Sequence, residues 1–415
     1  MTRRTIAVIG ASLSGLRAAQ QLRAQGYDDD LVVVGAEPHL PYDRPPLSKE
    51  YLRGTVGATD LALAEQSDID ELDARWHLGV AAERLDVTGG RIHLASGEGI
   101  AADGVVVATG GVPRRLPAAE GLLGVHVLRT LEDADALRTE LTGAAENVVV
   151  IGAGFIGAEV AATCRALGRD VTIVEAMPVP LSVALGPELG AVCAGLHAAH
   201  GVPLLTGVTV VEWVTTDDGA GRRRVTALEL SDGRRLRADV VVVGIGMQPA
   251  AGWLADSGLF LDNGVLTDAG YVTDRPNIVA VGDVARPYNP RTGRNVRREH
   301  WTDAAEGPAI AVRNLLAGRT VQHVDKPSYF WSDQYGTRIQ FAGSAEPSDE
   351  VRYLDGGPGD GAFVATYHRG GATTAVLAMN SPRQFTRLRR QLAAAARPAP
   401  AGAIPQSTAV GEVNR

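Results

Sequence analysis

Two glycine-rich turns constrain what this chain can fold into more than any other feature of the sequence. One lies in "TIAVIGASLSGLRAAQQLRAQGYDDDLVVVGAE", residues 5–37, and the other in "NVVVIGAGFIGAEVAATCRALGRDVTIVEAM", residues 147–177. The apolar run before each turn is typical of a strand buried on both faces of a parallel sheet, and a helical pattern follows it. Each stretch therefore predicts a strand–turn–helix–strand unit, and the pair predicts an α/β chain with two doubly wound dinucleotide-binding units.

The first turn contains Gly10, Ser12 and Gly15, with serine where the dinucleotide fingerprint usually has its second glycine. Gly10 permits the tight turn, and Gly15 lets the helix approach the strand closely. The start of the helix offers free N–H groups to a pyrophosphate, and the small Ser12 hydroxyl can itself contact phosphate. We expect Glu37, at the end of the second strand, to accept hydrogen bonds from adenosine ribose hydroxyls.

The second turn is a cleaner match, with Gly152, Gly154 and Gly157 followed 18 residues later by Glu175. An acid near this spacing binds the ribose 2′-hydroxyl. Because a carboxylate there would repel a 2′-phosphate, NADH is favoured over NADPH, although Arg169 lies just before the strand. Two such units suggest two dinucleotides, and the simplest pair is one bound FAD and one exchangeable nicotinamide.

Three further apolar runs read as buried strands. "DGVVVATGGVP", residues 103–113, and "ADVVVVGIGMQP", residues 238–249, each end in small residues, which indicates crossings between domains near a cofactor. "PNIVAVGDVAR", residues 276–286, ends in Gly282 and Asp283. An aspartate there can accept from a ribityl hydroxyl or lie beside the flavin pyrophosphate, so this strand also fits an FAD-binding domain.

The composition excludes several other classes of protein. A formal net charge of −8 argues against nucleic-acid binding over the whole surface. The first strand begins too near the N-terminus to leave room for a secretory leader, and no apolar run is long enough to span a membrane. Cys164 and Cys193 have no CxxC or metal-like spacing. We therefore expect a cytoplasmic protein with two buried thiols and no metal site.

The remaining motifs carry a family resemblance. In order stand the first turn, "RPPLSK", "ATG", the second turn with its acid, "GIG", "VGD", "EHWTDAAEGPAIAVRNLLAG" and "YFWSDQYG". This series, from residue 4 to about 390, resembles the NADH-dependent ferredoxin reductases that serve Rieske-type dioxygenases and bacterial haem monooxygenases. The resemblance implies two Rossmann-like domains arranged as in glutathione reductase, with a C-terminal α+β domain.

The resemblance also implies domain boundaries. It places the FAD-binding domain at 1–112 and 247–321, the NAD-binding domain at 113–246 and the C-terminal domain at 322–395. The Pro-, Ala- and Gly-rich tail, 396–415, has no periodicity and is predicted to be disordered.

Lysine is almost absent from this chain: of 40 basic residues, only those at positions 49 and 326 are Lys. A lysine is a compact point charge that can donate one hydrogen bond beside a flavin N5, whereas arginine is a planar fork. The resemblance places Lys49 beside the isoalloxazine and pairs it with Glu159, so that the pair bridges two domains where NADH transfers its hydride to the flavin. The alternative is a surface lysine retained by chance.

Three more residues have functional and structural interpretations. Arg44 follows "YD" and precedes two stiffening prolines, so it can be held against the FAD phosphates or the ring edge. Arg129 matches a family position that contacts FAD; alternatively it is a solvated arginine at a strand end. Trp301 stands where the family places a residue against the flavin; alternatively it is a buried structural tryptophan.

The motifs and the resemblance together predict two catalytic residues, Lys49 and Glu159. The predicted cofactor-binding residues are Gly10, Ser12, Ser14, Gly15, Glu37, Arg44, Lys49, Ala82, Ala108, Thr109, Gly110, Arg129, Gly152, Gly154, Phe155, Ile156, Gly157, Glu175, Gly246, Gly282, Asp283 and Trp301.

Two clusters of arginine stand out in an otherwise acidic protein. Small ferredoxins are typically acidic, so a basic surface would steer an acidic [2Fe–2S] ferredoxin to the reductase. The better candidate lies between Asp283 and Trp301, near the expected flavin, while the other lies near the C-terminus; either is otherwise plain solvated surface. The two clusters are Arg286, Arg291, Arg294, Arg297 and Arg298, and Arg383, Arg387, Arg389 and Arg390.

Other activities on a similar fold stay open. A flavin disulfide reductase or an NADH oxidase needs a cysteine beside the flavin, and this chain has none near positions 40 to 50. A reductase of rubredoxin or another carrier is compatible with the sequence. So is a flavoprotein sensor of the apoptosis-inducing-factor type, which would bind NADH and use the resulting conformation as a signal. No GxxxxGK[ST] motif or RNP-like aromatic stretch supports ATP or RNA binding.

Overall fold

The computed structural model of this chain describes residues 3–395. The predicted disordered tail therefore lies outside the described residues. Within them, no helix is long and apolar enough to cross a membrane, and no group of three or more His, Cys, Asp or Glu side chains is placed to hold a metal ion.

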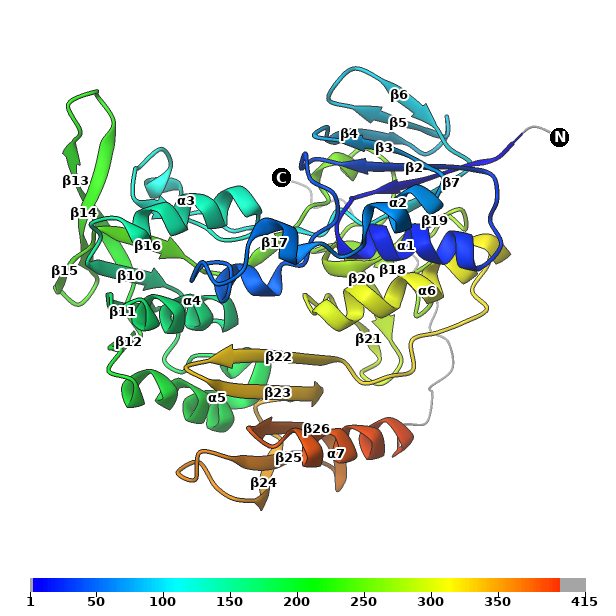
Figure 1. Cartoon of the computed structure of the whole chain (residues 1–415). Helices are drawn as coiled ribbons and strands as arrows, with labels where there is room; N and C mark the ends of the chain where they lie inside the picture. Colours follow the sequence, from blue (N-terminus) through cyan, green and yellow to red (C-terminus); the bar gives the residue numbers. More distant parts are fainter. Residues whose placement is uncertain (1–2, 396–415) are drawn as a thin grey trace, which may run out of the picture.

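The first glycine turn belongs to a five-stranded, all-parallel sheet (Figure 1). Helices α1 and α6 pack against each other on one face, and a three-stranded antiparallel sheet covers the other. Apolar strands such as "IAVI" form because both faces are buried. The sheet order is β19 (Ile278–Ala280), β7 (Gly104–Val107), β1 (Thr5–Ile9), β2 (Asp30–Gly35) and β3 (Ala74–Leu78). The covering elements are α1 (Leu13–Ala24), α6 (Trp301–Ala317), β4 (Ala82–Asp86), β5 (Arg91–Leu94) and β6 (Gly99–Ala101).

The second glycine turn belongs to another five-stranded parallel sheet, shown on the left of Figure 1. Alternate residues of one strand enter two different cores: Val148 and Val150 face helices α3 and α4, while Val149 and Ile151 face an antiparallel meander. The sheet order is β12 (Leu204–Thr206), β11 (Asp170–Glu175), β10 (Asn147–Ile151), β16 (Val240–Val243) and β9 (Val125–His126). The other elements are α3 (Leu131–Thr142), α4 (Phe155–Ala166), α5 (Ser182–Ala199), β13 (Val210–Asp217), β14 (Arg223–Leu230) and β15 (Arg235–Arg237).

The chain crosses between the two sheets twice, through β8 (Gly111–Pro113) and β17 (Met247–Pro249). These two short strands pair with each other in antiparallel fashion, so the outgoing and returning segments lie side by side. They come from the two stretches with small residues that the sequence marks as crossings. After β17 the chain returns to the first sheet with β19 and α6. The division into domains at the numbered boundaries stays a prediction.

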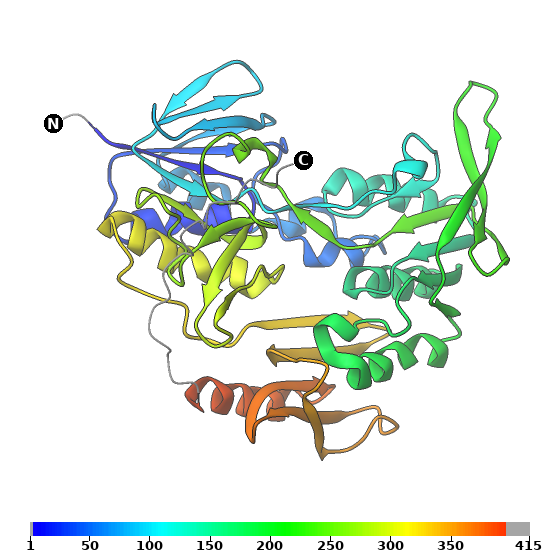
Figure 2. The same cartoon turned by 180° about the vertical axis from the view of Figure 1, so that it is seen from behind.

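The last part of the chain forms a five-stranded antiparallel sheet, at the bottom of Figure 2. One face packs on Leu185, Leu189 and Cys193 of α5, and the other on Phe385 and Leu392 of α7. The α+β character expected here is confirmed. The sheet order is β22 (Tyr329–Gln334), β23 (Thr337–Gly343), β26 (Ala372–Met379), β25 (Phe363–Arg369) and β24 (Glu350–Asp355), and α7 spans Pro382–Ala395.

Smaller elements complete the described chain. They are the helix α2 (Gln66–Glu71), the 3-10 helices η1 (Pro45–Ser48), η2 (Ala58–Leu61), η3 (Pro117–Ala119), η4 (Gly252–Leu254) and η5 (Gly282–Val284), and the strands β18 (Val265–Thr267), β20 (Ala285–Asn289) and β21 (Arg294–Asn295).

Candidate functional site

The first turn brings backbone against backbone. Gly10 has φ +118°, and a Cβ atom there would lie 2.1 Å from the Ala108 carbonyl oxygen at the end of β7. A Cβ at Gly15 would lie 1.7 Å from the Gly10 oxygen, so neither position accepts a side chain. Ser12 caps helix α1 without a side-chain capping bond, which leaves the N–H groups of the first turn available to an anion.

Ser14 and Gly282 pack against each other behind this turn. Ser14 is buried and donates to the Ala304 carbonyl at 3.0 Å, so its hydroxyl fastens α1 to α6. Gly282, at φ +69°, lies against that hydroxyl, where a Cβ would come within 2.4 Å. These two predicted residues are adjacent, and in this structure they serve the packing of the turn.

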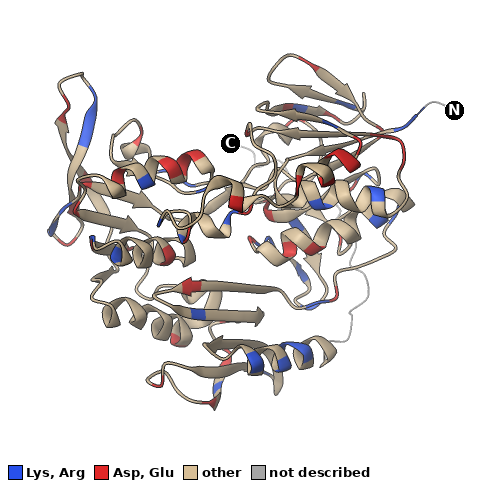
Figure 3. Ribbon diagram, in the orientation of Figure 1, with Lys and Arg blue, Asp and Glu red and all other residues tan. Residues whose placement is uncertain are grey.

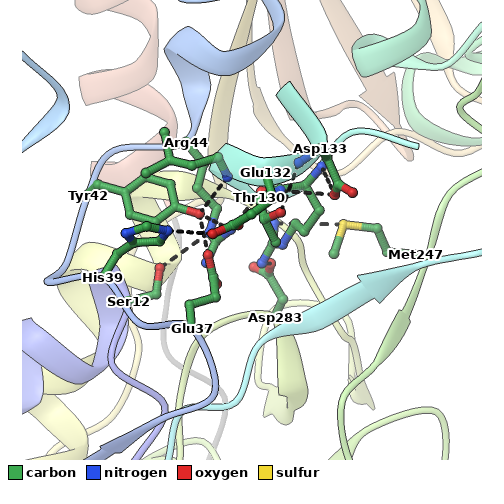
Figure 4. Close-up of polar contacts among 12 residues, drawn as sticks. Ser12, Glu37, His39, Tyr42, Arg44, Thr130, Glu132, Asp133, Met247 and Asp283 are labelled. Atoms are coloured by element: carbon green, nitrogen blue, oxygen red, sulfur yellow. Dashed lines mark hydrogen bonds and ion pairs between the residues drawn. The ribbon is translucent and has the colours of Figure 1, made fainter. Parts of the chain in front are cut away.

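Glu37 lies two residues beyond β2, not at its end as the sequence suggested, because the strand stops at Gly35. Its carboxylate is held by Arg44, whose Nη2 donates to Oε1 at 2.6 Å, and by the Tyr42 hydroxyl on Oε2 (Figure 4). Arg44 also donates to Ser12 Oγ at 3.3 Å and to the Arg129 carbonyl at 2.6 Å. Burial is the main reason that the pKa of Tyr42 is raised well above its usual value.

A second ion pair lies beside the first. Arg129 Nη2 donates to Asp283 Oδ2 at 2.9 Å, and its Nη1 lies 3.8 Å from the Met247 sulfur. Asp283 and Met247 are labelled in Figure 4. Burial lowers the pKa of the Arg129 guanidinium, and the Asp283 carboxylate opposes that shift. Three segments far apart in sequence thus meet here, and the alternative of a solvated arginine at a strand end does not describe Arg129.

The neighbouring strand end holds three of the other predicted residues. Ala108 is buried directly after β7, and the Thr109 hydroxyl donates to the Ala250 carbonyl at 2.7 Å. Gly110 adopts φ +69° and lies near the Arg129 guanidinium. Gly246, at φ +93°, faces open space, and Ala82 lies half-buried at the start of β4, against the core of the first unit.

The second turn repeats the backbone geometry of the first with different side chains. Gly152 has φ +101°, and a Cβ at Gly157 would lie 2.1 Å from the Gly152 oxygen. Glu175 Oε2 accepts from the Ala153 N–H at 2.7 Å, and Oε1 accepts from the Met177 N–H at 2.7 Å. In the part of the chain that the structure describes, the acid therefore braces the turn through backbone N–H groups alone.

The first residues of α4 differ in exposure. Gly154 is the N-cap, and Ile156 is about half exposed beside the turn. The Phe155 ring packs on Phe330 of the C-terminal sheet, with ring centroids 4.7 Å apart. Ile156 is therefore open to a nucleotide, whereas the Phe155 side chain joins two parts of the protein.

Lys49 and Glu159 meet as expected. Lys49 Nζ lies 2.8 Å from Glu159 Oε2, and the two side chains are 12% and 5% exposed. Ser48 Oγ donates to the same carboxylate oxygen at 2.6 Å. Ser332 Oγ and the Asp333 N–H donate to Oε1 at 2.8 and 3.2 Å. Lys49 is therefore not a surface lysine. Lys326 is one, because it pairs with Glu306 on the exposed surface.

Trp301 begins α6 and is half-buried. Its indole N–H donates to Asp43 Oδ1 at 2.7 Å, and its ring meets Trp331 edge to face, with centroids 6.0 Å apart. Burial is the main cause of the raised pKa of Asp43. His300 next to it shares hydrogen bonds with Ser328 and Asp303.

The first basic cluster is largely neutralised by its neighbours. Arg286 pairs with Asp262, Arg297 with Glu299 at 2.6 Å and Arg298 with Asp303 at 3.5 Å. Arg294 reaches Glu346 at 3.4 Å and stays the most exposed of these four, while Arg291 donates to the Asp325 carbonyl.

The second basic cluster lies on α7, which is rich in blue in Figure 3. Arg383, Arg387 and Arg390 are exposed there and have no ion pair within residues 3–395, whereas Arg389 stacks over the Tyr329 ring at 4.1 Å.

Both cysteines are fully buried, Cys164 in α4 and Cys193 in α5. Burial raises the pKa of each thiol to about 12, which leaves almost no reactive thiolate near neutral pH. They belong to separate cores, one of the second sheet and one of the C-terminal sheet, so they do not form a dithiol pair.

Sequence reasoning missed several residues around the predicted ones. Ser48, Ser332 and Asp333 bond Glu159, Tyr42 bonds Glu37, and Asp43 bonds Trp301. All of them stand inside the quoted motifs "YDRPPLSK" and "FWSDQY". Their signal was a short polar side chain next to a predicted site residue, which alone does not reveal its partner.

Two doubly wound sheets, each with a glycine turn and a following acid, define a dinucleotide-dependent oxidoreductase with two nucleotide sites. A family model described as pyridine nucleotide-disulphide oxidoreductase matches residues 4–307, and one described as reductase C-terminal matches residues 329–413. The chain therefore belongs to the pyridine nucleotide-disulphide oxidoreductase family. Its two cysteines supply no redox disulfide.

Relatives with known names are similar along nearly the whole chain. A ferredoxin–NAD(P)(+) reductase of Sphingomonas sp. is 35% identical over 403 residues, covering 97% of this chain and 95% of the relative. Putidaredoxin reductase of Pseudomonas putida is 33% identical and covers 92% and 89% of the two chains. The solved covalent putidaredoxin reductase–putidaredoxin complex contains a similar chain, with a TM-score of 0.89 at 31% identity and coverage of 95% and 94%.

Proposed function

We propose that this protein is a ferredoxin reductase, which takes electrons from NADH and passes them through bound FAD to a small iron–sulfur ferredoxin. The observation that carries the proposal is the buried Lys49–Glu159 pair at the junction of two dinucleotide-binding units, in a chain without a reactive cysteine. The similarity to named ferredoxin reductases over almost the full length supports it.

The residues present fit two dinucleotides. In each unit the glycines leave backbone where a Cβ would clash, and the N–H groups at the helix start have no side-chain cap. FAD in the first unit would be held by the first turn, Glu37 and the Arg129–Asp283 pair. When bound, FAD supplies the step from two-electron to one-electron transfer, which nicotinamide and an iron–sulfur cluster cannot make directly.

The chain's own residues have distinct tasks in this reaction. Lys49 presents one ammonium to a carboxylate that three further donors, Ser48, Ser332 and the Asp333 N–H, also bind and so hold in place. A fixed positive charge favours electron density that arrives near it. Trp301 donates its indole N–H to Asp43, six residues before Lys49, and meets Trp331 edge to face, so an aromatic pair lies next to the segment that carries the lysine.

NADH is the proposed donor, in preference to NADPH. Within residues 3–395 Glu175 has no cationic partner, and both of its oxygens accept from backbone N–H groups. From residue 176 to residue 221 the sequence contains no Lys or Arg that could bind a 2′-phosphate. The carboxylate would therefore repel NADPH and accept from the 2′-hydroxyl of NADH.

The proposed partner is an acidic [2Fe–2S] ferredoxin, docked near Arg286, Arg291, Arg294, Arg297 and Arg298. This loop lies in the sequence between Asp283 and Trp301, two residues predicted to bind the flavin, which supports docking close to the flavin. Four of these arginines are paired with carboxylates, and Arg294, whose side chain is the most exposed of the four, is expected to be the most accessible of them to ferredoxin. The α7 arginines are the second candidate surface.

An anaerobic rapid-mixing experiment tests the activity. The purified protein is mixed with NADH or NADPH, then with an oxidised [2Fe–2S] ferredoxin, and the flavin and cluster absorbances are followed. We expect fast flavin bleaching by NADH, slow bleaching by NADPH and rapid cluster reduction. Slow bleaching by NADH, with a charge-transfer band that persists beside ferredoxin, would instead indicate a sensor; bleaching without cluster reduction would point to another carrier.

Docking is tested by charge reversal. Arg294→Glu should raise the KM for ferredoxin and flatten its dependence on salt, with the rate of flavin reduction by NADH unchanged. Arg234→Glu, an exposed arginine on the meander that pairs with Asp232, is the matched control. If Arg387→Glu on α7 has the larger effect, the docking surface is α7 and not the loop.

A further inference from the structure

Three separate parts of the chain meet at the carboxylate of Glu159. Ser48 and Lys49 come from the loop between β2 and β3, Glu159 itself from α4, and Ser332 and Asp333 from β22. Oε2 faces the lysine, and Oε1 faces the C-terminal sheet. Each oxygen accepts two hydrogen bonds, so the carboxylate orientation depends on donors from both sides.

Strand β22 carries two polar residues, Ser332 and Gln334, on its buried face. Phe330, Ser332 and Gln334 are buried, whereas Tyr329, Trp331 and Asp333 alternate on the other face and are partly exposed. Ser332 and Gln334 have no exposed surface at all. Burying a polar side chain on the inner face of a strand costs free energy unless the side chain is hydrogen-bonded. The hydrogen-bond partners of Ser332 and Gln334 therefore indicate why polar residues are placed there.

The bonds of these two residues have a direction. Gln334 Nε2 donates to Ser332 Oγ at 3.1 Å, and Ser332 Oγ donates to Glu159 Oε1 at 2.8 Å. Because a serine hydroxyl has one proton and already accepts from Gln334, that proton is directed at the carboxylate. Within the described residues Gln334 Oε1 has no partner, so the glutamine is held there at a cost.

We propose that Ser332 is a positioning residue of the hydride-transfer site: it fixes the Glu159 carboxylate and, through it, the Lys49 ammonium, while Gln334 orients the Ser332 hydroxyl. This inference rests on the proposed function for Lys49, and it adds the C-terminal domain to the active site. Loss of the hydroxyl leaves Oε1 with the longer bond from Asp333 alone, at 3.2 Å. The carboxylate can then rotate, and the ammonium loses its fixed position.

A purely structural role makes a different prediction. If Ser332 only joined α4 to β22, its removal would lower the melting temperature and leave the chemistry of the surviving protein unchanged. Ser328 provides the comparison, because it is also buried, lies four residues earlier and bonds His300 and Asp303 but not Glu159. Ser328→Ala removes the same atom from the same segment.

The test is a double-mutant cycle on the FAD-loaded, full-length protein. Ser332→Ala and Lys49→Met are made singly and together, with Ser328→Ala as control. Two quantities are measured: the limiting rate of flavin reduction at saturating NADH, and the reduction potential of the bound flavin, set with a chemical reductant and no NADH. The melting temperature and the ratio of FAD to protein are recorded for every variant.

We expect Ser332→Ala to lower the limiting rate roughly tenfold, as one lost hydrogen bond to a charged group does, with little change in the Kd for NADH. It should also lower the potential, since a mobile ammonium stabilises the reduced flavin less. In the Lys49→Met background neither quantity should fall further. Ser328→Ala should change the melting temperature without these effects.

Two results would overturn the proposal. One is a Ser332→Ala protein whose rate and potential equal those of the parent, and the other is an equal loss with and without Lys49. The proposed function is judged separately, from wild-type reduction of ferredoxin. A parent protein that NADH reduces but that fails to reduce ferredoxin would refute the proposed function alone. If NADH does not reduce the parent flavin, the potential still decides the role of Ser332.

Discussion

The two dinucleotide-binding units share their backbone and differ in how they hold the acid that follows the second strand. In the first, Glu37 is enclosed by Arg44 and Tyr42, and Arg44 also reaches Ser12 in the turn. In the second, Glu175 accepts from two backbone N–H groups and has no side-chain partner among the described residues. The same fold thus provides one acid that is enclosed by side chains and one that is bound by backbone groups and not covered by side-chain partners. A fixed site suits a cofactor that stays bound, and an open site suits a nucleotide that enters and leaves.

Replacing the last glycine of each turn, Gly15 in α1 or Gly157 in α4, should distinguish the two units most strongly. Gly15→Ala places a Cβ 1.7 Å from a backbone oxygen, and we expect a protein that folds poorly and contains almost no FAD. Gly157→Ala meets its neighbour at 2.1 Å, and we expect a protein that retains FAD but is no longer reduced by NADH. The ratio of FAD to protein and flavin bleaching check the two variants. Loss of FAD from both would mean that the units do not have separate cofactors.

Lowering the pH should destabilise the second unit before the first. His197 of α5 is buried against Tyr335 of the C-terminal domain, and its Nδ1 lies 2.8 Å from the Tyr335 hydroxyl. Burial, helped by the nearby His200, lowers the pKa of His197 to about 4. The unfolded chain therefore binds a proton from about pH 6.5 downward, while the folded protein resists until about pH 4. Stability that is fully present above pH 6.5 should decrease toward pH 4, by at most about 3 kcal/mol.

Melting temperatures across this range, with His197→Gln as the control, measure the effect. Glutamine can accept from Tyr335 and does not titrate, so its curve should be flatter. The FAD content at pH 4.5 should stay close to that at pH 7, because the histidine lies outside the first unit. Parallel curves for the parent and the variant would exclude His197 as the cause.

Removing the Arg44 contacts that enclose Glu37 should make FAD exchangeable. Arg44→Met keeps the length of the side chain and removes the ion pair with Glu37, the bond to Ser12 and the bond to the Arg129 carbonyl. A partly buried carboxylate without its partner costs about 2 kcal/mol, so we expect FAD to be lost roughly 30-fold more readily. Flavin fluorescence after dilution measures this release. Retention like that of the parent would show that the enclosing contacts do not hold FAD.

Removing the second acid's charge should have the smallest effect. Glu175→Gln keeps the shape and one backbone acceptor, so the turn should persist. Without the negative charge NADPH is repelled less, and we expect the NADPH-to-NADH ratio of kcat/KM to rise about tenfold, equivalent to 1.4 kcal/mol. Steady-state rates with both nucleotides check it. An unchanged ratio would mean that another feature selects the nucleotide.

The sequence was sufficient for what depends on local patterns. The glycine turns, the buried strands beside them and the two crossing segments follow from periodicity and from residues that only one backbone conformation accepts. The Lys49–Glu159 contact was predicted from a resemblance, since no local pattern links residues 110 positions apart. Ser332 was visible in "FWSDQY", but its partner depends on how the C-terminal sheet docks on α4. Pairing of the arginine loop with acids such as Asp262 and Glu346 likewise arises from tertiary contacts.

The paired crossing strands β8 and β17 have a consequence for how such proteins are assembled. Because the segment between them leaves and returns at one place, its two ends are joined by a short antiparallel ladder. A nucleotide-binding module can therefore be removed or exchanged by cutting at two neighbouring points, without rethreading the rest of the chain. Chimeras that carry the corresponding segment of an NADPH-dependent relative have a natural pair of joints at Val112 and Gln248.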